Sequence, residues 1–214
     1  MADEAVTATM ESLFHNDEFA DVTVCAGDAK FKLHKSVLCT ASPWFRAACT
    51  RDFKESESAV IELPESAAEV KGLLLWLYGL TGRMGGELFA EEDSGTRIRL
   101  AIRLHMIGDK YNCSALSEHM TQRLRGELRF ADDLDVKEMV DVSVWAYSQT
   151  EGHIGERIHG LLAKATATHL HTLVANDALW QRVTSCSPYA RDVMRCIACS
   201  RGFPQLSNIL AKSD

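Results

Sequence analysis

The sequence lacks the patterns that define several large classes of protein. No apolar run is long enough to cross a bilayer, and residues 73–77 predict a buried helix segment instead. The acidic start, residues 1–4 (MADE), has no apolar core of a signal peptide, so we expect no secretion. The net charge is −7, and no stripe of Lys and Arg is interleaved with aromatic residues. Because a nucleic-acid groove needs such a positive surface, we expect no direct binding to DNA or RNA.

Motifs for catalysis are missing as well. The chain has no Gly-x-Ser-x-Gly elbow and no His-Glu-x-x-His helix. The Gly-rich segment 79–96 lacks the Gly-Lys-Ser/Thr end and the preceding buried strand of a phosphate-binding loop, so it predicts an exposed, mobile loop. We therefore expect a protein that is not an enzyme and that needs no cofactor.

The seven cysteines are odd in number and scattered, which indicates reduced thiols in an intracellular compartment, the cytoplasm or the nucleus. Cys196 and Cys199 form the tightest pair, and one interpretation joins them with His169 and His171 in a zinc site. Zinc sites of this kind bring two close ligand pairs on turns. Here the cysteines lie in a helical pattern, and histidines two residues apart point to different faces of a helix. Structural cysteines on a packed helix, without metal, are the favoured interpretation.

Two short segments of alternating apolar and polar residues, followed at once by an apolar helix, are the most informative feature present. Residues 21–24 and 31–34 have the period of half-buried strands. Residues 26–29 between them (AGDA) predict a turn, so the pair predicts a hairpin. In the helix that follows, Ser36 is expected to act as the N-cap and Pro43 to break or restart the helix.

The remaining elements follow from periodicity and capping signals. Ser66 and Glu69 have the spacing of a capping box that opens a helix through Tyr78. Apolar spacing further predicts a helix over 5–15, a strand over 60–63, and helices over 97–110 and 114–125. Beyond Phe130 the pattern is wholly helical. Helix starts are expected at Asp135 with Glu138, at Asn176 or Asp177, and at Ser187 with Pro188.

Short motifs also recur in a specific order along the first 128 residues. They are Asp21 in the first strand, His34-Lys35 at the strand-to-helix junction, Tyr78-Gly79, and Gly108-Asp109-Lys110-Tyr111 followed by Leu116. Together they closely resemble a BTB/POZ domain, although the family's Tyr-Thr-Gly has lost its Thr here. The resemblance implies an α+β fold, with a small three-stranded sheet flanked by a helical cluster in residues 1–128 and an all-α extension over 131–214. It also implies a non-enzymatic module that binds other proteins.

The resemblance implies a dimer interface at the first predicted helix. In dimeric relatives, a helix at this place packs across the two-fold axis against the partner. Val6, Met10, Leu13 and Phe14 would then form a self-complementary apolar stripe. The alternative is that these side chains cover the core of their own chain.

Asp21 and Lys35 match an acidic and a basic residue that line a charged pocket near the dimer interface in that family. A buried pair would be sensitive to loss of one partner, because the remaining charge would be uncompensated. The alternative is that Asp21 ends its strand and Lys35 is solvated.

Phe53-Lys54-Glu55 matches the hydrophobic-x-Glu motif of cullin-binding relatives, in which the apolar residue enters a pocket on the cullin scaffold. The alternative is that Phe53 packs beneath its own loop and Glu55 faces solvent.

The resemblance therefore predicts a homodimerising interaction module that presents a bound substrate to a cullin-type ubiquitin ligase. The helices after Phe130 would hold the substrate or extend the cullin contact. A stand-alone scaffold or transcriptional co-regulator that binds no cullin is the second hypothesis. An enzyme with a Cys/His or zinc site is the third. The expected partners are proteins, with no membrane and no nucleic acid bound directly.

Overall fold

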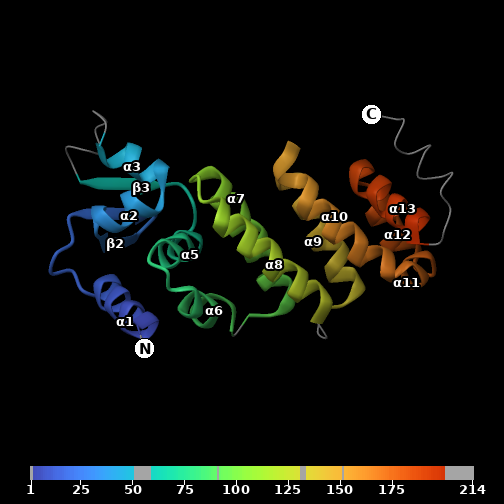
Figure 1. Ribbon diagram of the computed structural model, residues 1–214. Coiled ribbons are helices and arrows are strands. Elements are labelled where there is room, and N and C mark those ends of the chain that lie inside the picture. Colours follow the sequence, from blue (N-terminus) through green and yellow to red (C-terminus); the bar gives the residue numbers. More distant parts are fainter. Residues whose placement is uncertain (1, 51–58, 91, 131–133, 151, 201–214) are drawn as a thin grey trace. The chain divides into compact units, whose positions relative to one another are not determined.

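The computed structural model describes residues 2–50, 59–90, 92–130, 134–150 and 152–200 (Figure 1). The chain divides into two compact units. Residues 1–92 with 103–119 form the sheet-containing unit, and residues 93–102 with 120–214 form the helical unit. None of the described helices combines the length and the apolar content that a membrane-spanning helix requires. The predicted α+β class, a small sheet with many helices, is confirmed.

The strands form one small mixed sheet in the order β2-β1-β3. They are β1 (Val22–Ala26), β2 (Ala29–Leu33) and β3 (Val60–Leu63). β1 is antiparallel to β2 and parallel to β3, and Val24 pairs with Phe31 on one side and Ile61 on the other. Gly27 has a φ of +57°, which costs little in a residue without a Cβ and allows the tight turn of the hairpin. The predicted hairpin and third strand are confirmed.

Two short helices, α2 (Lys35–Ala41) and α3 (Pro43–Thr50), follow β2. The predicted restart at Pro43 is confirmed. Ser42 joins the two helices and is fully buried. Its hydroxyl oxygen accepts the Phe45 N–H at 3.3 Å and donates to the Tyr111 carbonyl at 2.8 Å. The hydroxyl therefore caps α3 and ties it to a distant part of the chain.

The predicted N-cap at Ser36 is wrong. α2 begins one residue earlier, with His34 at the N-cap position and no side-chain cap from that residue. The Asp21 carboxylate accepts the Lys35 N–H at 2.7 Å and satisfies one of the amides that a helix start leaves free. Because this partner lies before the hairpin, local spacing around Ser36 could not reveal it.

Two further helices of the sheet-containing unit are α1 (Ala2–His15) and α5 (Ala67–Leu77). The predicted capping box is confirmed: the Ser66 hydroxyl accepts the Glu69 N–H at 3.4 Å, and the Glu69 carboxylate accepts the Ser66 N–H at 2.7 Å. The side chains of α5 are buried on almost every side, as its nearly continuous apolar sequence predicts. The helix ends at Leu77, with Tyr78 as its C-cap.

The prediction of a mobile loop over 79–96 is wrong, because α6 (Thr81–Phe89) occupies much of it. Glycine disfavours helix, and this helix contains three glycines. Met84 and Phe89, however, are 1% and 2% exposed. Burial of two large apolar side chains therefore outweighs the low helix propensity of the segment.

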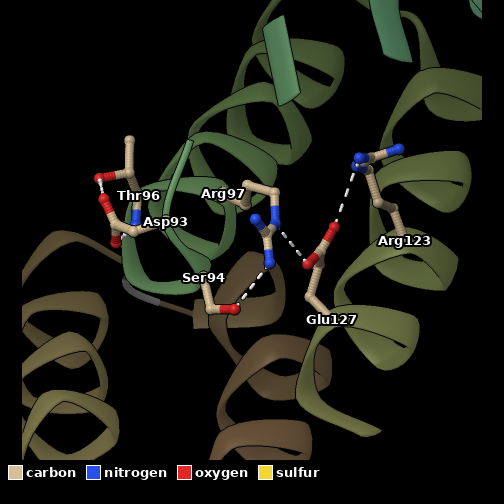
Figure 2. Close-up of polar contacts among 6 residues, drawn as sticks. All are labelled: Asp93, Ser94, Thr96, Arg97, Arg123 and Glu127. Carbon is tan, nitrogen blue, oxygen red and sulfur yellow. Dashed lines mark hydrogen bonds and ion pairs between the residues drawn. The ribbon is translucent and has the colours of Figure 1, made fainter. Parts of the chain in front are cut away.

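The long helices α7 (Ser94–Lys110) and α8 (Ser114–Phe130) follow. α7 begins three residues earlier than predicted, because the Asp93 carboxylate accepts both the Thr96 N–H at 2.9 Å and the Thr96 hydroxyl at 2.7 Å (Figure 2).

Figure 2 also shows Glu127 between two arginines. Its oxygens lie 2.8 Å from Arg97 Nε and 3.3 Å from Arg123 Nη2, so one largely buried carboxylate joins the first turns of α7 to the end of α8.

Five more helices of the helical unit complete the described chain: α9 (Val136–Gln149), α10 (Gly152–Thr168), α11 (Leu170–Val174), α12 (Asp177–Thr184) and α13 (Ser187–Ser200). The predicted cap at Asp135 is confirmed, since its carboxylate accepts the Glu138 N–H at 2.7 Å. Asn176 caps α12. The core of these helices contains buried residues at Val140, Tyr147, Ala163, Leu173, Val183, Tyr189 and Val193.

Candidate functional site

α1, the predicted dimer helix, lies against its own chain at its C-terminal end. The Phe14 ring meets the Tyr78 ring edge to face, with the centroids 5.2 Å apart. Met10 and Leu13 are half-buried, whereas Val6 is 58% exposed. The four residues of the predicted stripe therefore do not share one environment. Phe14 covers the core of its own unit, and Val6 remains available to a partner.

A chain of ion pairs fastens α1 to the neighbouring helices. Arg83 Nε of α6 lies 2.7 Å from Glu11 of α1, and Arg83 Nη1 lies 3.1 Å from Glu87. Lys71 of α5 lies 2.6 Å from the other Glu87 oxygen. The hydrogen bonds from Lys71 and Arg83 outweigh burial and lower the pKa of Glu87. A groove of about 610 Å³ lies between α1 and α6, with Thr7, Glu11 and Arg83 among its lining residues.

Tyr78 connects α1 to the junction of β2 and α2. Its hydroxyl oxygen lies 3.0 Å from the His34 backbone nitrogen and 2.9 Å from His34 Nδ1. The hydroxyl oxygen accepts the backbone N–H, and the tautomer of the His34 ring decides which atom donates in the second contact. Burial raises the pKa of Tyr78 to about 12. The Tyr78-Gly79 motif thus joins three elements through one side chain.

Asp21 and Lys35, the predicted charged pocket, are in contact through the backbone. The Asp21 carboxylate accepts the Lys35 N–H, while Asp21 itself is exposed and Lys35 is half-buried. No ion pair between their charged groups occurs among the described residues. The role of the two side chains in a dimer stays a prediction.

Phe53 and Glu55, the predicted cullin contact, lie outside the described residues. The described chain ends at Thr50 of α3 before this segment and resumes at Ala59. Their role therefore also stays a prediction.

The Gly108-Asp109-Lys110-Tyr111 motif lies at the C-terminal end of α7 and in the turn that leads to α8. A Cβ on Gly108 would lie 2.5 Å from Ser117 Oγ and 2.8 Å from the Ser117 backbone nitrogen, so only glycine fits there. Lys110 forms an ion pair with Glu65, and the Tyr111 hydroxyl donates to Glu65 at 2.6 Å. Burial opposes ionisation of Glu65, but these two hydrogen bonds outweigh it and lower the pKa of the carboxyl.

The comparisons with known proteins agree with this geometry. The family model described as the BTB/POZ domain matches residues 10–127, more than half of the chain. The chain belongs to the BTB/POZ domain family. This family is a non-enzymatic protein-interaction module, and the matched residues contain the hairpin, α5, the Tyr78 junction and the Gly108 motif.

Curated relatives that contain BTB/POZ domains show the same likeness. The chain is 27% identical over 134 residues to Kelch repeat and BTB domain-containing protein 4 of Macaca fascicularis, covering 62% of this chain and 22% of that protein. It is 28% identical over 138 residues to Kelch-like protein 35 of Mus musculus, covering 63% of this chain and 22% of that protein. The chain thus spans about a fifth of the length of these relatives.

The zinc site considered for Cys196 and Cys199 with His169 and His171 lacks a suitable group of ligands. In the part of the chain that the structure describes, no three or more His, Cys, Asp or Glu side chains lie close enough together to hold a metal ion. Sequence reasoning missed Phe19, which is 72% exposed between α1 and β1, and it missed the Glu11–Arg83 pair. An aromatic residue just before a strand is ordinarily taken as core, and the ion pair joins residues far apart in the sequence.

Proposed function

We propose that this BTB/POZ protein is a homodimeric adaptor that presents a bound protein to a cullin-type ubiquitin ligase. The observation that carries this proposal is the BTB/POZ match over residues 10–127 together with the Kelch-like relatives. In the proposal, α1 forms the dimer contact and Phe53 with Glu55 touches the cullin. The helices beyond Phe130 hold the substrate or extend the cullin contact. The protein acts in the cytoplasm or the nucleus.

The dimer rests on α1. Val6 is 58% exposed, so a charged residue at this position leaves the packing of its own chain intact. We expect wild-type protein to be a dimer by light scattering at micromolar concentration, and Val6→Asp to be a monomer, because a dimer would bury the new charge without a partner. Val174→Asp is the matched control, since Val174 is another exposed apolar side chain and lies in the helical unit. A wild-type monomer that is unaffected by deletion of residues 1–16 would contradict the dimer.

The cullin contact is tested by capture of a purified cullin on immobilised protein. Truncating a buried aromatic anchor costs about 2 kcal/mol or more, which corresponds to about a 30-fold loss of affinity. We expect such a loss for Phe53→Ala and a loss for Glu55→Lys, whereas Lys54→Ala, which lies between them, binds like the wild type. Equal capture by all variants, or capture by none including the wild type, excludes this contact. A dimer that captures no cullin would be the stand-alone scaffold or transcriptional co-regulator.

A further inference from the structure

Cys39 of α2 and Cys49 of α3 are free, half-buried thiols on two helices that pack against each other. Cys39 is held to α3 at two points. Its sulfur lies 3.8 Å from the Phe45 carbonyl oxygen, and its own carbonyl oxygen accepts a hydrogen bond from Arg46 Nε at 2.9 Å. Both the side chain and the backbone of Cys39 are therefore fixed against the first turn of α3.

The second thiol projects toward the same place. Side chains in an α-helix lean toward the N-terminus and cover the preceding turn, so Cys49 covers the turn that contains Phe45. Cys39 contacts this same turn through the Phe45 carbonyl, and the Cys49 thiol forms a side-chain hydrogen bond with Cys39. Burial, together with this contact, raises the pKa of Cys49 to about 11.

Lys35 lies one helical turn before Cys39 on α2, and its charge favours the thiolate form of Cys49. Asp21, which is bonded to the Lys35 amide, opposes that effect. Both residues are half-buried rather than sealed in the core.

We propose that Cys39 and Cys49 are a redox modification site, a dithiol that closes to an intramolecular disulfide by exchange with a small-molecule disulfide such as oxidised glutathione. Cys39 loses its proton and attacks one sulfur of the oxidant, which forms a mixed disulfide and releases one glutathione thiolate. Cys49 then loses its proton and attacks the Cys39 sulfur, which forms the protein disulfide and releases the second thiolate. Each released thiolate takes up one of the two protons. The dithiol has lost two electrons, and the oxidant has become two thiols.

The order of the two steps follows from the environment of Cys49. Because its pKa is raised, Cys49 is a neutral thiol at neutral pH and a poor first nucleophile. Cys39 reacts first, and Cys49 resolves the mixed disulfide from its neighbouring position. This inference goes beyond the proposed adaptor function and holds whether or not a cullin binds.

The test is a titration of the purified 214-residue chain with buffers of rising oxidised-to-reduced glutathione ratio, followed by acid quenching, alkylation and mass spectrometry. We expect two of the seven cysteines to become protected from alkylation, a linked peptide pair containing Cys39 and Cys49, and full reversal in reduced glutathione. Cys49→Ser should stop at a glutathione adduct on Cys39, and Cys39→Ser should give no adduct on Cys49. Cys25→Ser, which removes a half-buried thiol of β1, should close like the wild type.

Three outcomes would overturn the proposal. One is full alkylation of both cysteines at every ratio. Another is a disulfide that joins other cysteines or two chains, and the last is a wild-type chain that stops at the mixed disulfide. Circular dichroism of each variant before oxidation separates a lost reaction from a lost fold, because a variant with the wild-type spectrum that still fails to close has lost only the chemistry.

Discussion

Tyr111 joins several elements of the sheet-containing unit. Its ring meets Trp44 edge to face at 4.7 Å and stacks on Phe45, both from the start of α3. Its carbonyl accepts the Ser42 hydroxyl, and its own hydroxyl donates to Glu65. A residue in the turn after α7 thus holds α3 and the approach to α5 in place.

We expect Tyr111→Phe to reduce the free energy of unfolding by about 1.5–3 kcal/mol, because the lost hydrogen bond goes to a charged carboxylate. The ring contacts with Trp44 and Phe45 remain in this variant. Tyr111→Leu should cost more, since it removes the aromatic contacts as well. Urea denaturation of the three proteins measures the differences, and equal midpoints for Tyr111→Phe and wild type would show that the hydroxyl contributes nothing.

At the scale of the element, α6 is a helix that its own sequence disfavours. A Cβ on Gly82, Gly85 or Gly86 would find no atom within 4 Å, so none of these glycines is needed for close packing inside the chain. Each leaves the unfolded chain more freedom than alanine would. The helix is therefore stabilised by the burial of Met84 and Phe89 and weakened by its glycines.

We expect Gly82→Ala and Gly86→Ala each to raise the free energy of unfolding by about 0.4–1 kcal/mol, because alanine favours helix and meets no neighbour at these positions. Gly108→Ala is the matched control with the opposite sign, since its Cβ would lie 2.8 Å from a backbone nitrogen. Thermal and urea denaturation measure both effects. A lower free energy of unfolding for Gly82→Ala than for the wild type would contradict this expectation.

The predictable elements are those whose signals are local. The hairpin around Gly27, the restart at Pro43 and the caps at Ser66 and Asp135 depend on residues within a few positions of one another, and the sequence was sufficient to predict them. α6 could not be predicted, because its helix depends on where Met84 and Phe89 are buried.

The candidate site divides in the same way. The apolar spacing of α1 could be recognised in the sequence. The packing of Phe14 on Tyr78 and the exposure of Val6 could not be predicted, because the Phe14–Tyr78 contact joins residues that are distant in sequence. The Asp21 contact with the Lys35 amide was hidden for the same reason. A motif match could name the residues of the BTB/POZ domain without giving the atoms through which they act.

At the scale of the whole molecule, the two units contain groups that respond to different ranges of pH. In the helical unit, the His159 ring stacks on Tyr147 with the centroids 3.6 Å apart, and its Nε2 lies 2.6 Å from the Thr150 hydroxyl oxygen. That hydroxyl donates to the Ala146 carbonyl, so His159 Nε2 carries a proton and donates to it. Burial lowers the pKa of His159 below its ordinary value of 6.5, although Asp192 attracts the charged form.

The direction of these pKa shifts determines how the stability of each unit changes with pH. A pKa that is lower in the folded chain than in the unfolded chain means that the unfolded chain binds more protons, so stability falls as the pH falls. For His159 the loss begins as the pH falls through its ordinary value of 6.5. For Glu65 of the sheet-containing unit, it begins at the lower ordinary value of 4.5.

We therefore expect acid to destabilise the helical unit at a higher pH than the sheet-containing unit. The four tryptophans provide reporters, with Trp44 and Trp76 in the sheet-containing unit and Trp145 and Trp180 in the helical unit. Fluorescence of the double variants W44F/W76F and W145F/W180F during acid titration follows each unit separately. His159→Gln should shift only the helical transition, and Glu65→Gln only the other. Coincident transitions that neither substitution moves would contradict this expectation.

The way α1 is fastened has a consequence for its motion. None of the side chains described for this helix, residues 4–15, is fully buried, whereas α5 has seven buried residues. Local opening of a segment costs less free energy when fewer apolar contacts are broken, so α1 should detach far more often than the sheet unfolds. Its amide hydrogens should exchange with deuterated solvent before those of α5. A helix held in this way can open and close again while the rest of the domain stays folded.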